Sequence, residues 1–380
     1  MRKRRKLLHH ADLYNHPSTD ALFLAAMGEI TAFHMAHNPQ YAQIVAEQGF
    51  APEHLATLDD LHRIPALPTL FLKRHTMFTR PEGKMVLKST TSGTSGRKST
   101  VGIDLNTALF SLEMVLRSFR HFKLTSLIPT NYIILGYQPS RHNQLGITKT
   151  AFGFTFITPT LRRSYALKDT GDSYELNIEG LVSDLIRYEK QGFPVRFMGL
   201  PAYHYLLLTT LKERGIRLKL HPKSRLCLGG GWKQFYFERA DKGELYALAE
   251  EVLSIPEERC IDFFGAVEHP VLYCDCKNHH FHVPAYSRVI IRDVNTFEPL
   301  GYGKAGILNL LSPLMRSMPL HSIMTDDLAI LHEGSACDCG NPAPYFELLG
   351  RAGLSEIKTC AAGAAQFLAE DFTMPKEGRP

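Results

Sequence analysis

The chain has 380 residues, 44% of them hydrophobic and 21% charged, which are the proportions of an ordinary globular protein rather than of a disordered or fibrous one. Its net charge of +5 is too small, and its basic residues are too scattered, to indicate nucleic-acid binding. No stretch reaches the roughly 18 apolar residues of a membrane span, and the N-terminus lacks the apolar region of a secretory signal. We therefore expect a cytoplasmic protein with no membrane span and no nucleic acid partner.

The first 80 residues are expected to form a helical segment. The basic run at residues 2–6 is predicted to be a solvated tail, since no aromatic interleaving follows it. Apolar residues at helical spacing predict an amphipathic helix over residues 20–35. The proline-punctuated stretch 64–71 is expected to be too rigid for a helix. It would act as a strap that leads into the next motif.

Residues 90–99, Thr-Thr-Ser-Gly-Thr-Ser-Gly-Arg-Lys-Ser, combine six hydroxyls with two glycines and two cations. Hydroxyls, backbone N–H groups and a cation all donate to phosphate oxygens, so this segment is a candidate nucleotide loop. The spacing of Gly93, Gly96 and Lys98 excludes a Walker-type P-loop. The apolar flanks, residues 85–88 and 100–103, favour a loop between two short strands. A mobile Gly/Ser turn is the alternative interpretation.

From residue 195 onward, strands and helices alternate. Strands are predicted at 195–200, 225–228 and 260–264, and helices at 201–214 and around 245–252. This is the βαβ pattern of a parallel sheet, in which ligands bind at the carboxyl ends of the strands. Beyond residue 285 the chain becomes richer in β-structure, with candidate strands at 288–294, 306–311 and 328–332.

Five segments occur in an order that resembles the adenylate-forming superfamily of acyl and aryl CoA ligases. They are the loop at 90–99 and residues 229–231, 263–268, 325–328 and 350–351. More narrowly, the chain resembles the LuxE-type acyl-protein synthetase family. That resemblance is carried by Ile64-Pro65 to Phe71-Leu72-Lys73, by the loop, by residues 229–233 and by Cys360-Ala361.

The resemblance implies an α/β adenylate-forming fold with parallel-rich sheets, a β-rich C-terminal part and a truncated mobile C-terminal domain. Residues 1–349 would be the adenylation domain, and 350–380 a short tail. The implied enzyme is an acid-thiol ligase that uses ATP and Mg²⁺ to convert a fatty acid to acyl-adenylate. It would then carry the acyl group on its own Cys360 as a thioester, for delivery to a partner reductase of a fatty acid reductase complex.

The resemblance also implies roles for individual residues. The phosphates of ATP would be held by Ser92, Gly93, Thr94, Ser95, Gly96 and Lys98, with Lys98 serving the reaction itself. Adenine would lie against Gly229, Gly230 and Gly231, with Phe264 and Gly265 beside it. Glu268 would hold Mg²⁺, Asp327 would accept hydrogen bonds from the ribose hydroxyls, and Arg351 would be a nearby cation. Asp326 stands where the superfamily often has glycine, which leaves the choice between Asp326 and Asp327 slightly open. The structural alternatives are a close-packed glycine turn, a surface carboxylate at Glu268 and an ordinary salt bridge at Arg351.

Among the candidate residues, Cys360 matters most for the implied reaction, because it would receive the acyl group. Its thiol would attack the acyl-adenylate, and Lys358, a histidine or a nearby helix end could lower its pKa. The lysine that the missing C-terminal domain supplies in other superfamily members would have to be replaced, with Lys358 and Lys376 as candidates. In the alternative interpretation Cys360 is a small apolar residue.

Two cysteine pairs, Cys274/Cys276 and Cys337/Cys339, predict a structural zinc site with four protein ligands. His279, His280 or His282 could replace one thiol, and reduced buried cysteines are the alternative.

Two other functions fit the sequence. One is a CoA ligase related to phenylacetate-CoA ligase, in which a free thiol substrate replaces Cys360. The other is a catalytically degenerate nucleotide-binding scaffold. The acid's chain length cannot be deduced from the sequence, although residues 137–146 and 199–203 should form part of its pocket.

Overall fold

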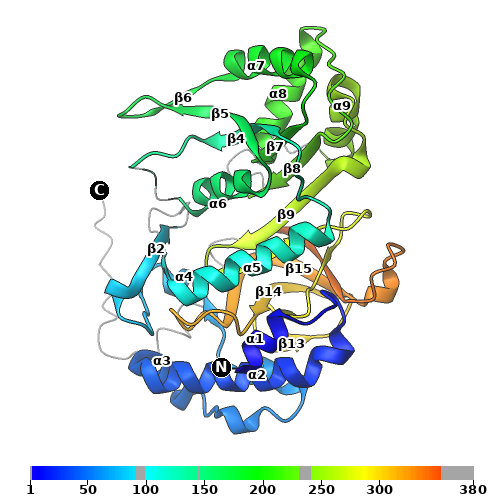
Figure 1. Cartoon of the computed structure of the whole chain (residues 1–380). Helices are drawn as coiled ribbons and strands as arrows, with labels where there is room; N and C mark the ends of the chain where they lie inside the picture. The colour runs from blue at the N-terminus through cyan, green and yellow to red at the C-terminus, as the bar shows by residue number, and fades with distance from the viewer. Residues whose placement is uncertain (1, 91–98, 142, 144, 231–240, 352–380) are drawn as a thin grey trace, which may run out of the picture. The chain divides into compact units, whose positions relative to one another are not determined.

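The computed structural model describes residues 2–90, 99–141, 143, 145–230 and 241–351 (Figure 1). These residues form two compact units. Unit 1 contains the described residues of 1–114, 266–271 and 282–380, and unit 2 contains those of 115–265 and 272–281.

A sheet with the strand order β10-β9-β8-β7-β4-β5-β6 runs through unit 2. The neighbours β9, β8, β7, β4 and β5 are parallel, and β6 is antiparallel to β5. The predicted βαβ pattern is therefore confirmed. The strands are β4 (Thr130–Tyr137), β5 (Thr160–Asp169), β6 (Tyr174–Leu176), β7 (Val195–Gly199), β8 (Arg225–Gly229), β9 (Cys260–Ala266) and β10 (His269–Cys274).

Helices cover both faces of this sheet. On one face, Ile133 and Leu135 of β4 pack with apolar residues of α7, α8 and α9. On the other face, Ile134 packs with Phe119 of α5 and Phe154 of α6. Because successive side chains of a strand point to opposite faces, burial on both sides requires a nearly continuous apolar strand. The helices are α5 (Leu105–His121), α6 (Gly146–Phe154), α7 (Ile178–Gln191), α8 (Pro201–Glu213) and α9 (Lys242–Leu253).

Unit 1 contains a mainly antiparallel sheet with the strand order β11-β16-β15-β14-β12-β13, and β1 pairs in parallel with β15. The strands are β1 (Leu67–Pro68), β11 (Phe281–His282), β12 (Arg288–Arg292), β13 (Pro299–Leu300), β14 (Ala305–Leu311), β15 (Ser322–His332) and β16 (Tyr345–Arg351). A separate hairpin joins β2 (Met85–Thr90) to β3 (Thr100–Asp104). The predicted β-rich part is thus confirmed.

Helices of unit 1 come mostly from the start of the chain. The predicted helix at 20–35 is confirmed as α2, which buries Phe23, Met27 and Ile30. The helices are α1 (Arg2–Leu8), α2 (His16–His37), α3 (Pro39–Glu47) and α4 (Thr69–Leu72). The short 3-10 helices of unit 1 are η1 (Pro52–His54), η2 (Leu58–Arg63), η3 (Glu82–Lys84) and η7 (Gly334–Ala336). Unit 2 contains η4 (Thr155–Ile157) and η6 (Glu257–Arg259).

The expectation of a solvated basic tail at residues 2–6 is wrong. These residues begin α1, and Arg4 is 1% exposed. The Arg4 guanidinium donates to the carbonyl of Leu314 and lies 4.5 Å from the ring centroid of Phe110. Burial, reinforced by the charge of Arg316, lowers the Arg4 pKa to about 10. A basic run can therefore contain one buried anchor that its composition does not reveal.

The expectation that residues 64–71 exclude a helix is also wrong at its end. Pro68 closes β1 and is the N-cap of α4, which lasts for only four residues. Proline is tolerated at the start of a helix because the first N–H groups have no intrahelical partner.

Among the described residues, no helix is long and apolar enough to cross a membrane.

Two glycine substitutions test the packing of unit 1. A Cβ at Gly306 in β14 would lie 2.3 Å from the carbonyl oxygen of Arg292, whereas one at Gly28 in α2 would meet nothing within 4 Å. We expect Gly306→Ala to lower the free energy of unfolding by about 1–3 kcal/mol through overpacking. Gly28→Ala should raise it by about 1 kcal/mol through helix propensity. Urea unfolding measures both, and equal effects would contradict the strand packing.

Candidate functional site

The pairing of β15 is irregular where two adjacent aspartates occur. Met324 pairs with Asn309 of β14, and Leu328 pairs with Ile307, so Leu308 alone lies opposite residues 325–327. Thr325 stabilises this bulge, because its hydroxyl donates to the carbonyl of Leu308 and accepts from the N–H of Asp327. Bulges commonly redirect side chains beside functional sites. Here the bulge carries Asp326 and Asp327.

Asp326 is held by Thr69, the first residue of α4, and by Lys73, the C-cap residue of that helix. It accepts a hydrogen bond from the Thr69 hydroxyl, and the Lys73 ammonium lies 3.6 Å from its other carboxylate oxygen. Burial alone would raise the pKa of Asp326, but Thr69 and Lys73 outweigh it and lower the pKa. The Asp326 carboxylate is therefore ionised and neutralised by a lysine.

Asp327 has a different partner. It pairs in register with Arg351 of β16, and the Arg351 Nε lies 3.5 Å from its carboxylate. Burial raises the pKa of Asp327 to about 6, although the charge of Arg351 opposes that rise. The sequence left the choice between Asp326 and Asp327 slightly open. Asp326 is bound to Thr69 and Lys73, while Asp327 keeps acceptor capacity.

Glu268 lies in the same unit and is 4% exposed. Burial raises its pKa, a hydrogen bond with Ser99 lowers it, the charge of Asp326 raises it and that of Lys73 lowers it. The charge of Asp326 thus acts on Glu268, and two carboxylates so close to one another offer hard oxygen donors that suit a divalent cation. The surface-carboxylate alternative for Glu268 is therefore excluded, and the residues present fit Mg²⁺.

Three residues of this site had no assigned role in the sequence analysis. Thr69 and Lys73 belong to a segment that carries the family resemblance, and their spacing of four residues would place both on one face of a helix. That signal was hidden because the prolines argued against a helix. Ser99 was included only as the last hydroxyl of the glycine loop.

The glycine loop itself lies outside the described residues at Ser92, Gly93, Thr94, Ser95, Gly96 and Lys98. Its two ends are described. Thr90 ends β2 and pairs with Thr100, which begins β3. The prediction of a loop between two short strands is confirmed at both flanks, and the phosphate-binding role stays a prediction.

Gly229 ends β8 and Gly230 follows it, at the carboxyl edge of the sheet in unit 2. Gly230 has φ of +83°, and a Cβ there would lie 2.2 Å from the Cδ1 of Ile147. The left-handed backbone favours glycine at this position. Gly231 lies outside the described residues.

Phe264 and Gly265 belong to β9 of the same sheet. The Phe264 ring lies 6.0 Å from that of Tyr273 and 5.9 Å from that of Phe281. It is half-buried, and Gly265 is exposed. Stacking of Phe264 on adenine stays a prediction.

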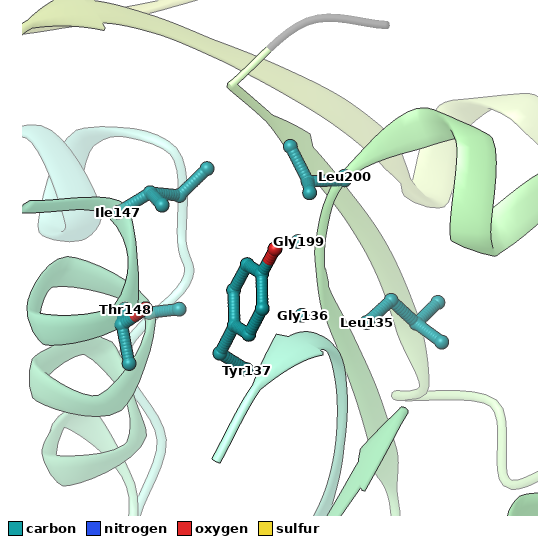
Figure 2. A pocket seen from close by; sticks show the side chains of 8 residues that line it. Leu135, Gly136, Tyr137, Ile147, Thr148, Gly199 and Leu200 are labelled. Atoms are coloured by element: carbon teal, nitrogen blue, oxygen red, sulfur yellow. The ribbon is translucent and has the colours of Figure 1, made fainter. Parts of the chain in front are cut away.

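A small pocket opens at the carboxyl ends of β4 and β7 in unit 2. Figure 2 shows the Tyr137 ring inside it with its hydroxyl end toward Gly199, between the side chains of α6 and Leu200. The lining contains no charged side chain, and the hydroxyl of Thr148 is buried with no hydrogen-bond partner among the described residues. The pocket is lined by Leu135, Gly136, Tyr137, Ile147, Thr148, Ala151, Gly199 and Leu200.

The four cysteines that were predicted as zinc ligands do not share one environment. Cys274 is fully buried in β10, and burial raises the pKa of its thiol far above the usual value. In unit 1, by contrast, the His282 Nε2 lies 3.2 Å from the Cys339 Sγ. In unit 1, His282 therefore takes the place of the buried Cys274 beside Cys337 and Cys339 as a candidate ligand. None of the six described cysteines forms a disulfide, and Cys360 lies outside the described residues.

Comparisons with known proteins agree with this geometry. The chain is 25% identical over 356 residues to a long-chain-fatty-acid–luciferin-component ligase of Vibrio harveyi, covering 91% of this chain and 87% of that protein. It is 23% identical over 314 residues to a phenylacetate-coenzyme A ligase of Thermus thermophilus, covering 80% of this chain and 63% of that protein.

A solved structure shares the fold. An open conformation of 2-hydroxyisobutyryl-CoA ligase, in complex with 2-HIB-AMP and CoA, superposes with a TM-score of 0.65 at 18% identity, covering 87% of this chain and 74% of that one. The adenylate-forming fold is thus confirmed. The family described as "Acyl-protein synthetase, LuxE" matches residues 14–369. The chain therefore belongs to the LuxE family of acyl-protein synthetases, which are ligases.

Proposed function

We propose that this protein activates a fatty acid with ATP and then carries the acyl group on Cys360. The observation that carries the proposal is the family match over residues 14–369, which includes Cys360. In the first step a carboxylate oxygen attacks the α-phosphorus of ATP, and pyrophosphate leaves. In the second the Cys360 thiolate attacks the acyl carbon, and AMP leaves with the bonding electrons.

The ATP site would draw on the described carboxylates of unit 1. Asp327 accepts the ribose hydroxyls, since a carboxylate offers two acceptor oxygens. Arg351, at 3.5 Å from Asp327, orients that carboxylate and supplies positive charge. The loop residues Ser92 to Gly96 and Lys98 would stabilise the departing pyrophosphate. Gly229 to Gly231, with Phe264 and Gly265, would provide the surface for adenine.

Glu268 would hold Mg²⁺, which neutralises the phosphate charge. Its support is the buried carboxylate, whose pKa is raised by burial and by Asp326 and lowered by Lys73. Zinc has no step in this reaction, because a site with four protein ligands leaves no open position for water or substrate.

The apolar pocket of unit 2 would receive the part of the acid next to its carboxyl group. Its lining offers apolar side chains, two hydroxyls and no charge, which suits an alkyl chain better than a charged substrate. Tyr137 is held in place because its ring lies 4.9 Å from Tyr174, whose hydroxyl donates to the carbonyl of Gln138.

The proposed organisation has an adenylation domain at residues 1–349, with its N-terminal helical segment at 1–80, and a tail at 350–380 that carries Cys360. The proposed setting is the cytoplasm, with an acyl reductase as partner. The similarity to phenylacetate-coenzyme A ligase favours one alternative, in which CoA replaces Cys360 as the thiol. The proposal and this alternative differ in the thiol that finally holds the acyl group, which is Cys360 in the first and CoA in the second.

Cys360→Ala separates the two half-reactions. With ATP and a labelled fatty acid, we expect the variant to keep ATP–pyrophosphate exchange and to lose acyl labelling of the protein. Cys227→Ala is the matched control, since Cys227 is buried in β8 and burial raises its pKa to about 11. Intact mass spectrometry and exchange assays measure the outcomes. Labelling of Cys360→Ala at the wild-type level would refute the carrier role while leaving adenylation standing.

The raised pKa of Asp327 leads us to expect that nucleotide binding depends on pH. Its carboxyl is protonated below a pKa of about 6, so the affinity for adenosine should fall as the pH drops through that value. Adenosine is the probe because it lacks the phosphate of AMP, whose own second pKa is about 6. Asp327→Asn should remove this step and weaken binding by about 1–3 kcal/mol. Asp326→Asn should keep the step but move it to lower pH, because the charge of Asp326 raises the pKa of Asp327. Calorimetric titration with adenosine from pH 5 to 8 measures it, and an unchanged step in Asp327→Asn would contradict the assignment.

Tyr137 should limit the length of the acyl chain that the pocket accepts. Because its ring lies inside the pocket, Tyr137→Ala should shift exchange activity toward longer acids. Each additional buried methylene contributes about 0.8 kcal/mol, or about fourfold in kcat/KM. Tyr302→Ala, at an exposed tyrosine of unit 1, is the control. An unchanged chain-length profile in Tyr137→Ala would place the acyl chain elsewhere.

A further inference from the structure

Three side chains of unit 1 meet beside the β15–β16 connection. His282 belongs to β11, and Cys337 and Cys339 lie in the connection between the two strands. Their ligand atoms lie within 4.8 Å of one another. His282 is 1% exposed and Cys337 is 5% exposed, so water is largely excluded. Two thiols and an imidazole in such proximity are soft donors that suit zinc.

The hydrogen bonds of His282 fix which nitrogen can bind a metal. Its Nδ1 lies 2.7 Å from the carbonyl oxygen of Ala343, which can only accept, so Nδ1 carries the proton. The Nε2 then presents a lone pair, and this is the atom 3.2 Å from the Cys339 Sγ. A histidine that donates to a backbone carbonyl through its other nitrogen is the usual arrangement of a metal ligand.

The sequence repeats one pattern at both cysteine pairs. Residues 274–278 read Cys-Asp-Cys-Lys-Asn, and residues 337–341 read Cys-Asp-Cys-Gly-Asn. In each, the second cysteine sulfur accepts the N–H of the asparagine two residues later, at 3.4 Å for Cys276 and 3.3 Å for Cys339. An N–H donor of this kind stabilises a thiolate over a thiol. Cys276 and Cys339 are therefore equivalent by local geometry.

Cys274 does not share these features. It is 1% exposed in β10 and packs in the apolar cluster that includes Ile261 and Phe263. Cys276, in contrast, lies at the start of a tight hairpin, where its N–H donates to the carbonyl of His280, two residues before His282.

We propose that His282, Cys337 and Cys339 bind a structural zinc ion, with Cys276 as the fourth ligand. Binding releases the thiol protons and closes a tetrahedral site of three thiolates and one imidazole. In unit 1 the ion fastens the β15–β16 connection to β11, where Gly334 already approaches Pro342 so closely that a Cβ would lie 2.1 Å from the Pro342 carbonyl oxygen. The site is independent of the proposed reaction.

The test is the metal content of the full-length protein, purified without a metal-affinity tag under reducing conditions. Elemental analysis should find about one zinc per chain, as expected for a closed four-ligand site. Cys276→Ser, Cys339→Ser and His282→Ala should lose it, while His282→Cys should retain it as a four-thiolate site. Cys274→Ala, two residues from a proposed ligand, is the matched control and should keep the metal.

Cobalt substitution of the wild-type protein provides a measurement that needs no variant to fold. The cobalt form should show the intense visible bands of a tetrahedral ion and the near-ultraviolet charge-transfer bands of thiolate ligands. Wild-type protein that binds neither zinc nor cobalt would overturn the proposal. Zinc lost from Cys274→Ala but kept by Cys276→Ser would also overturn it, in favour of a different ligand set.

Discussion

The bulge in β15 is the constraint on which the described part of the proposed nucleotide site depends. A regular antiparallel pairing with β14 would place residues 325–327 opposite three residues and send Asp326 and Asp327 to opposite faces of the sheet. In this chain Leu308 alone lies opposite them. The Thr325 hydroxyl makes the hydrogen bonds that the ladder loses there. With the bulge, Asp326 forms an ion pair with Lys73, and Asp327 forms one with Arg351.

Charge compensation explains why this arrangement is stable without a ligand and ready for one. Asp326 has a lysine within 3.6 Å, whereas burial raises the pKa values of Glu268 and Asp327. Buried carboxylates of this kind disfavour the charged form until a cation or hydrogen-bond donor arrives. A magnesium ion near Glu268 and hydroxyl donors near Asp327 would supply what the protein alone does not. In the proposed site, the same carboxylates would therefore favour ATP with its metal.

The sequence predicted the parallel sheet well, because strands such as β7 and β8 are mostly apolar and alternate with helices along the chain. It also predicted the two strands that flank the glycine loop, whereas the roles of Asp327 and Glu268 stay predictions. It could not predict the Thr69–Asp326–Lys73 contact, which joins segments about 250 residues apart. Nor could it decide between Cys274 and His282, because burial in β10 and the tautomer of His282 depend on packing. The buried Arg4 was missed for the same reason.

The central claim is that an acyl-adenylate is discharged onto the protein's own thiol. A single-turnover experiment tests it directly, with enzyme in excess over labelled ATP and labelled fatty acid, and with acid quenching at successive times. The account predicts that acyl-adenylate appears first and decays at the rate at which a hydroxylamine-sensitive thioester forms on the peptide that contains Cys360, with AMP released in step. Acyl-adenylate that persists until CoA is added, with no thioester on the protein, would contradict it.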